Sequence, residues 1–110
     1  MNNCKNINLC MVRGDTFAFS FEVEGINNLT TAYFSCKSNV DDENYIFQKS
    51  LTDGISQVEG GKYRVRVAPT DTKDIEVGSY YYDLEIGANS DIFTILKGVL
   101  KIEHDITRGE

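Results

Sequence analysis

Few residues of this sequence have the types and spacing that catalysis requires. His104 is the only histidine among the 110 residues, so any Ser–His or Cys–His nucleophilic pair must include it. The cysteines Cys4, Cys10 and Cys36 are an odd set without CxxC spacing, which is typical of neither a zinc site nor a disulfide framework. Phosphate-binding glycine loops, HExxH and GxSxG are absent. We therefore expect no catalytic residues, no metal site, no cofactor and no enzymatic activity.

Three consecutive acidic residues, Asp41, Asp42 and Glu43, lie in the polar run SNVDDEN. Carboxylates could hold calcium, but a calcium loop spaces its oxygen ligands at alternate positions and adds a distal glutamate. This run has neither feature. We therefore interpret residues 38–44 as an exposed, solvated acidic loop.

The tripeptide Arg13-Gly14-Asp15 has two interpretations. It is the sequence that integrin receptors bind, and it also directly precedes the clearest strand pattern of the chain. Integrin binding requires an extended extracellular loop, whereas glycine and aspartate are favoured in tight turns. We expect this tripeptide to be the turn that leads into a strand.

Two small sets of side chains could bind a partner. Lys62, Arg64 and Arg66 alternate with apolar residues, so they form a basic stripe on one face of a strand. This stripe is either an ordinary solvated face or a docking patch for an acidic neighbour or a second copy of the protein. Tyr33 and Tyr81 are expected on outward faces, where tyrosines often anchor interfaces. The sequence alone does not say whether these two tyrosines share a sheet.

Composition limits the class of protein. The size of 110 residues predicts one domain spanning residues 1–110. Apolar residues make up 41% and charged residues 25%, which is a globular balance without a membrane span. The 17 acidic and 11 basic side chains give a net charge of −6, which repels nucleic acid and anionic lipid. No signal peptide is evident, so we expect a cytoplasmic location without nucleic acid or membrane partners.

Alternation of apolar and polar residues dominates the chain, and this period is typical of half-buried strands. The clearest block is residues 16–24, in which Phe17, Phe19 and Phe21 share one face. A crossover with one helical turn is expected at 70–77, after Pro69. The predicted strands are residues 6–12, 16–24, 30–37, 45–50, 54–58, 62–68, 79–87 and a long last segment after the turn at 88–91.

The last segment has two features of its own. Gly98 interrupts the pattern, and a missing Cβ inside a strand suggests a bulge or bend. Leu100 and Ile102 continue the inward face beyond it, and His104 falls on the same face by spacing.

These strands predict an all-β fold, an immunoglobulin-like antiparallel β-sandwich of seven to eight strands. A single sheet would leave the phenylalanine stripe in water, so a second sheet must cover it. In the run VGSYYY, Tyr80 has the position of a tyrosine corner, whose phenol bonds back to the preceding connection. Tyr82 and Phe34 stand where antibody domains have a cysteine and a tryptophan. A core without the disulfide suits a reducing compartment.

The ordered segments RGDTFAFSFEVEG, AYFSCK, FQKSL, GGKYRVRVAPTDT, VGSYYYDLEIG and DIFTILKGVLKIEHDIT span most of the chain. Together they resemble the small immunoglobulin-like proteins encoded in the structural modules of tailed phages and prophages. More distantly, they are similar to the N-terminal immunoglobulin-like domain of phage baseplate upper proteins. The resemblance implies a virion component, made in the host cytoplasm and then part of the virion. It supplies no catalytic residues.

We therefore expect a non-enzymatic structural or accessory protein of the baseplate, tail, neck or head. Its expected partners are other virion proteins, with further copies of itself in a symmetric assembly left open. A carbohydrate-binding accessory module that stacks exposed tyrosines on sugar rings is the alternative. A small hydrolase built on His104 would be a third class, and we expect no such activity.

Overall fold

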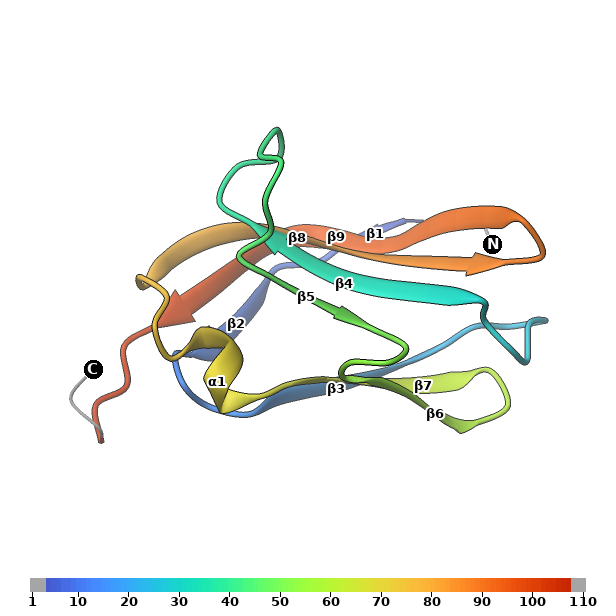
Figure 1. Cartoon of the computed structure of the whole chain (residues 1–110), viewed down its shortest axis with the longest axis horizontal. Helices are drawn as coiled ribbons and strands as arrows, with labels where there is room; N and C mark the ends of the chain where they lie inside the picture. Colours follow the sequence, from blue (N-terminus) through green and yellow to red (C-terminus); the bar gives the residue numbers. More distant parts are fainter. Residues whose placement is uncertain (1–3, 108–110) are drawn as a thin grey trace.

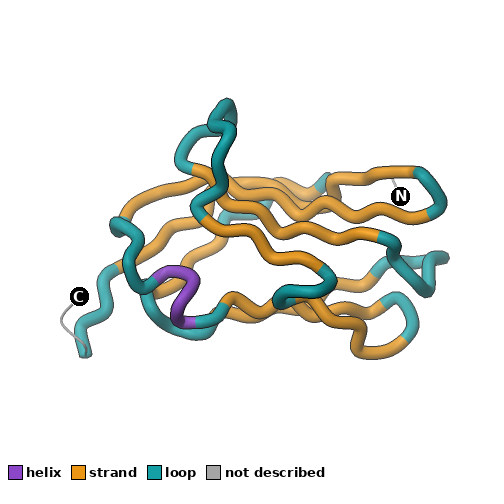
Figure 2. The backbone as a smooth tube through the Cα atoms, viewed as in Figure 1, coloured by secondary structure: helices purple, strands orange, loops and turns teal. Residues whose placement is uncertain are grey.

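A computed structural model describes residues 4–107 of the chain. Within this range the backbone forms nine strands and one short helix (Figures 1 and 2). No helix among these residues is long and apolar enough to cross a membrane. The elements are β1 (Lys5–Asn6), β2 (Leu9–Val12), β3 (Phe17–Glu22), β4 (Thr31–Lys37), β5 (Phe47–Ser50), β6 (Ile55–Glu59), β7 (Lys62–Val67), α1 (Pro69–Thr72), β8 (Gly78–Ala88) and β9 (Asp91–Glu103).

The strands form two layers, which Figure 1 shows edge-on. One is a six-stranded sheet with the order β1-β9-β8-β4-β5, in which β2 also pairs with β9. The other is a three-stranded sheet with the order β3-β7-β6. Immunoglobulin domains place their second, fifth and fourth strands in one sheet and their third, sixth and seventh strands in the other. Strands β3, β7 and β6 correspond to the second, fifth and fourth of these strands, and β4, β8 and β9 correspond to the third, sixth and seventh. The predicted immunoglobulin-like β-sandwich is therefore confirmed.

The first strand differs from the prediction. Residues 6–12 were expected to form one strand, but they divide into β1 and β2, which raises the number of strands among the described residues to nine. Both pair with β9 in parallel, with Lys5 opposite Leu96 and Leu9 opposite Leu100. Alternation predicts which residues lie in strands but not the direction of the neighbouring strand, so the parallel pairing of β1 and β2 with β9 was not predicted.

Phe34 is the centre of the core. It is fully buried on β4, and its ring centroid lies 5.5 Å from that of Tyr82 on β8. The Phe19 ring of the opposite sheet meets Phe34 edge-on at 5.3 Å. These rings occupy the region where antibody domains place a disulfide and a tryptophan. The stripe of Phe17, Phe19 and Phe21 faces the second sheet as predicted, but all three rings are only partly buried.

The tyrosine corner predicted at Tyr80 is present. The phenol of Tyr80 donates a hydrogen bond to the backbone carbonyl of Glu76, in the connection that precedes β8. Two residues later, the Tyr82 hydroxyl donates to the carbonyl of Ile7 at 2.5 Å. The two tyrosines therefore fix β8 to the loop before it and to the N-terminal segment.

The tripeptide Arg13-Gly14-Asp15 is a turn between β2 and β3, as the sequence predicted. Gly14 has a φ of +81°, which glycine adopts at little cost, and the Asp15 amide donates to the carbonyl of Val12. The half-buried Arg13 donates from Nη1 to the Ile75 carbonyl at 3.1 Å, and the Gly14 amide donates to Thr72 Oγ1 at 2.9 Å. The turn is therefore bound to the region around α1.

Two predictions for the last strand were wrong. Gly98 was expected to mark a bulge or bend, and the bulge is not there, because Gly98 pairs in register with Tyr82 and the register shift lies between Leu84 and Glu85. Gly98 is instead required for a close approach, because a Cβ there would lie 2.3 Å from the carbonyl oxygen of Ile7. His104 was expected to continue the inward face, but β9 ends at Glu103 and the His104 side chain is exposed.

A buried lysine joins β5 to α1. Lys49 is only 5% exposed, and its Nζ lies 2.9 Å from Asp71 Oδ2 and 3.1 Å from Asp53 Oδ1. Asp71 Oδ2 also accepts a hydrogen bond from the Ala68 amide at the start of α1. Burial alone would lower the pKa of Lys49, but the two carboxylates outweigh it and raise this pKa above its usual value. The ion pair stays charged at neutral pH and fixes α1 to the sheet.

Candidate functional site

The outer face of the six-stranded sheet carries a concavity of about 480 Å³. We call its lining the tyrosine face, because three of its side chains are partly exposed tyrosines from β4, β8 and the loop before β5. The lining residues are Tyr33, Ser35 and Lys37 of β4, Val40 and Tyr45 of the loop, Gln48 of β5, and Tyr81, Tyr82, Asp83 and Glu85 of β8.

Strand pairing explains why these residues meet. Strand β4 runs antiparallel to β8, and its outward positions face the outward positions of β8. The pairs are Tyr33 with Glu85, Ser35 with Asp83, and Lys37 with Tyr81. Side chains directly opposite each other on an antiparallel pair have Cβ atoms about 5 Å apart. The tyrosine face therefore alternates aromatic and charged groups across two adjacent strands.

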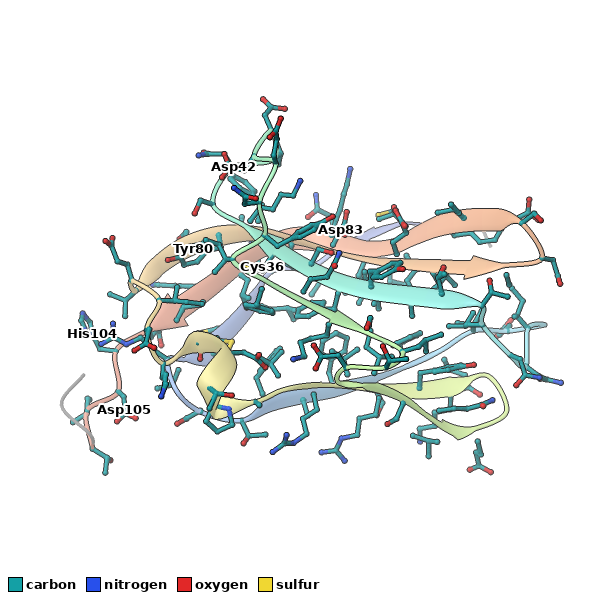
Figure 3. All side chains as sticks on the ribbon, in the orientation of Figure 1. Cys36, Asp42, Tyr80, Asp83, His104 and Asp105 are labelled. Atoms are coloured by element: carbon teal, nitrogen blue, oxygen red, sulfur yellow. The ribbon has the colours of Figure 1, made fainter. Side chains whose placement is uncertain are left out.

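The rim of the face is built by the acidic loop. Lys37 Nζ donates to the backbone carbonyl of Asp42 at 2.7 Å and lies 5.1 Å from the ring centroid of Tyr45. The Asp42 carboxylate accepts from the Asn39 amide within the loop. Figure 3 shows Asp42 and Asp83 above the six-stranded sheet, on the side away from the three-stranded sheet. Asp42 thus has a local structural role in shaping this loop.

Asp83 is a carboxyl group of the tyrosine face whose pKa is shifted by its surroundings. Partial burial raises its pKa above the ordinary value of 3.8, and the nearby Lys37 ammonium opposes that rise. Ser35 of β4 and Lys97 of β9 are its strand neighbours. A carboxylate that is only partly solvated in this way is stabilised when a cationic side chain of a partner protein covers it.

We expect Asp83→Asn to increase the free energy of unfolding at pH 7. The folded state binds a proton at Asp83 more readily than the unfolded chain, so this group favours folding below pH 3.8 and loses that contribution as the pH rises through the folded pKa. The gain from Asp83→Asn should therefore disappear at about pH 3. Urea unfolding at several pH values measures it. The exposed loop variant Asp41→Asn should change stability by less than about 0.5 kcal/mol at each pH, and a loss of stability in Asp83→Asn at pH 7 would contradict the assignment.

The structure separates the two sets of candidate site residues. Tyr33 and Tyr81 lie on the tyrosine face together, a relation that the sequence left open. Lys62, Arg64 and Arg66 are exposed on β7, on the outer face of the other sheet. The two sets therefore lie on opposite faces of the sandwich and cannot form one surface.

The basic stripe has acidic and neutral neighbours. Lys62 pairs in register with Glu22 of β3 and Glu59 of β6, so one end of the stripe faces acidic side chains. Arg64 lies between Ser20 and Ser56. The geometry of this stripe is that of an ordinary solvated strand exterior.

The single histidine, His104, lies away from the buried cysteine Cys36. Figure 3 shows His104 and Asp105 at the C-terminal end of the described chain, away from Cys36 and Asp83. Burial raises the pKa of the Cys36 thiol to about 12, so this thiol stays protonated in the core and is a poor nucleophile. Among residues 4–107, no group of three or more His, Cys, Asp and Glu side chains is arranged to hold a metal ion.

Several members of the tyrosine face were not predicted from the sequence. Lys37, Tyr45, Gln48, Asp83 and Glu85 belong to it, and the Gln48 side chain donates to Ser35 Oγ at 2.9 Å. Alternation correctly indicates that Lys37, Asp83 and Glu85 point outward. It carries no signal that β4 is the neighbour of β8, and that adjacency creates the face.

Comparisons with known proteins leave the family open. No protein-family model matches the chain, and no curated protein matches it. The chain is similar to a solved structure of the ZIG-8–RIG-5 IG1–IG1 heterodimer, with 12% identity, 93% of this chain and 86% of that chain covered, and a TM-score of 0.47. It is also similar to the extracellular domain of the voltage-gated sodium channel beta4 subunit, a parallel homodimer, with 9% identity, 96% and 98% covered, and a TM-score of 0.46. The strand order and the tyrosine corner described above identify the fold as immunoglobulin-like.

Proposed function

We propose that this protein is a non-enzymatic structural or accessory component of a phage or prophage particle that binds other virion proteins through its tyrosine face. The observation that carries this proposal is the concavity that exposed Tyr45 and Tyr81 line together with Asp83. Tyr45 and Tyr81 are 48% and 46% exposed, which is high for large aromatic side chains. Tyrosine is enriched among the few residues that carry most of the binding energy at protein interfaces.

The architecture behind the face supports this role. The tyrosines of β4 and β8 project from a sheet whose other side is the fully buried core around Phe34, so the backbone that presents them is rigid. A preorganised surface loses little conformational entropy when it binds. The neighbouring carboxyl groups of Asp83 and Glu85 favour a partner that brings lysine or arginine to the contact.

The phage part of the proposal comes from the sequence resemblance, in which the ordered segments from about Arg13 to Thr107 are similar to small immunoglobulin-like virion proteins. A component present in many copies binds through many weak contacts, and the effective concentration within a particle strengthens each one. We therefore propose assembly in the host cytoplasm followed by incorporation in the virion. The baseplate, tail, neck and head are all compatible positions.

We expect Tyr81→Ala to lower the affinity for the virion partner about 30-fold, which corresponds to about 2 kcal/mol. The protein is expressed together with the products of its neighbouring open reading frames, and its incorporation into purified particles is quantified. Arg64→Ala changes the opposite face, and Val58→Ala removes a 52% exposed side chain of β6, so both control variants should be incorporated normally. Normal incorporation of Tyr81→Ala, or a failure of Arg64→Ala alone, would contradict a role for the tyrosine face.

A carbohydrate-binding module is the second candidate, and the same concavity favours it. Sugar rings stack on aromatic side chains, and the Asp83 and Glu85 carboxylates with the Gln48 amide could accept and donate hydrogen bonds to hydroxyl groups. A glycan array separates the candidates. Glycan binding that is lost in Tyr81→Ala and retained in Arg64→Ala would favour the module, whereas the absence of glycan binding together with particle incorporation favours the virion component.

A further inference from the structure

The edge of β3 is a second exposed surface, separate from the tyrosine face. In the order β3-β7-β6, β3 pairs only with β7, so its other side has no strand neighbour among residues 4–107. The N-terminal strands that could have covered it pair with β9 in the other sheet. The sandwich is therefore open along this side. A groove of about 720 Å³ lies there, and its apolar lining includes Ile7, Leu9, Phe19, Phe21 and Leu96.

The register shows which backbone groups are free. The Val23 amide donates to the carbonyl of Gly61, the residue before β7, so Val23 and every second residue before it bond towards β7. The intervening residues Ala18, Ser20 and Glu22 direct their N–H and C=O groups to the open side. Proteins commonly protect such an edge with proline, lysine or a bulge. The strand FAFSFE has none of these.

We propose that this edge binds the same edge of a second copy, forming an antiparallel β3–β3 pair around a two-fold axis at Ser20. This register is self-complementary. Ser20 faces Ser20 of the second copy, and Ala18 faces its Glu22, so all the free groups of the edge are paired. The small side chains of Ala18 and Ser20 allow the strands to approach closely. On the inner face, Phe19 meets Phe21 of the second copy, which covers the half-buried rings.

Charge favours a second copy as the occupant. In this register the two Glu22 carboxylates are not opposite each other. Each instead faces an Ala18 whose neighbour on β7 is Arg66, so an acidic group of one copy lies near a basic group of the other. The apolar grooves of the two copies also meet and close over each other. The interaction extends the proposed function, because it joins copies of the protein through a surface separate from the tyrosine face.

Sedimentation velocity of the full chain tests the proposal, over about 1 µM to 1 mM protein. About 0.15 M salt screens the net charge of −6 on each chain. We expect a monomer–dimer equilibrium whose dissociation constant rises at least about tenfold in Ser20→Lys, because the axis places two added ammonium groups together. Ser56→Lys is the matched control, since Ser56 and Ser20 both pair with Arg64, on opposite sides of β7. It should dimerise like the wild type, as should Tyr81→Ala.

Ser20→Pro provides a second variant. Proline lacks the backbone N–H that Ser20 directs to the open side, and within residues 4–107 the monomer makes no strand pairing with this group, whereas the proposed dimer does. Circular dichroism confirms that each variant is folded. A dimer that is lost in Ser20→Lys or Ser20→Pro and retained in Ser56→Lys supports the β3–β3 pair. A wild type that remains monomeric to about 1 mM, or a dimer that neither Ser20 variant weakens, would overturn it. Because Tyr81→Ala leaves the dimer intact, failure of this inference is distinguishable from failure of the proposed function.

Discussion

Phe34→Ala is expected to lower the free energy of unfolding by about 3–5 kcal/mol, the usual cost of removing a fully buried phenylalanine ring. Phe34 has no exposed surface and contacts Phe19, Phe47 and Tyr82, so its loss leaves a cavity between the two sheets. Domains of this size are stable by about 5–15 kcal/mol, so the variant loses a large share of its stability. Urea unfolding measures this as a lower midpoint with an unchanged slope.

Tyr33→Ala is the matched control for this change. Tyr33 precedes Phe34 on β4 but points to the outer face, where it is only partly buried. We expect it to cost less than about 1 kcal/mol. Equal losses in Phe34→Ala and Tyr33→Ala would show that the aromatic core does not hold the two sheets together.

Gly98→Ala is expected to displace the N-terminal segment from β9. Its Cβ would lie 2.3 Å from the Ile7 carbonyl oxygen, a backbone atom that cannot move without the chain. Overpacking of this kind costs about 1–3 kcal/mol, and losing the hydrogen bond from Tyr82 to Ile7 adds about 1 kcal/mol. Hydrogen exchange should report the change, because the Ile7 amide donates to the Lys97 carbonyl and would exchange faster.

Gly78→Ala controls for backbone conformation. Gly78 and Gly98 have similar φ values, +152° and +157°, but a Cβ on Gly78 meets no atom within 4 Å. The difference between the two variants therefore isolates the contact with Ile7. If both variants lose the same stability and the Ile7 amide stays protected, the close approach of Ile7 to β9 is not required for folding.

The sequence predicts the strands and their faces well because burial on one side imposes a period of two. Alternation correctly gives the inward positions of Phe34, Tyr82 and Val65, and the turn chemistry of Gly14 correctly places the entry to β3. The tyrosine corner at Tyr80 was also predictable, because its hydrogen bond is local in the sequence.

What the sequence could not supply is the pairing of distant strands. Tyr33 and Tyr81 are outward on their own strands, but only the register of β4 with β8 brings them to one concavity. The parallel attachment of β1 and β2 to β9 is likewise a long-range choice, and it explains both the requirement for Gly98 and the free edge of β3. His104 was placed wrongly because the alternation continues past the residue where the strand ends.

Hydroxyl-radical footprinting of the protein, free and in purified particles, tests the central claim most directly. Oxidation of Tyr45 and Tyr81 reports their solvent exposure, which is 48% and 46% in the free chain. We predict that both tyrosines are protected in the particle, whereas Val58 on the opposite sheet, 52% exposed, keeps its reactivity. Tyrosines that stay as reactive in the particle as in the free protein would contradict binding through the tyrosine face.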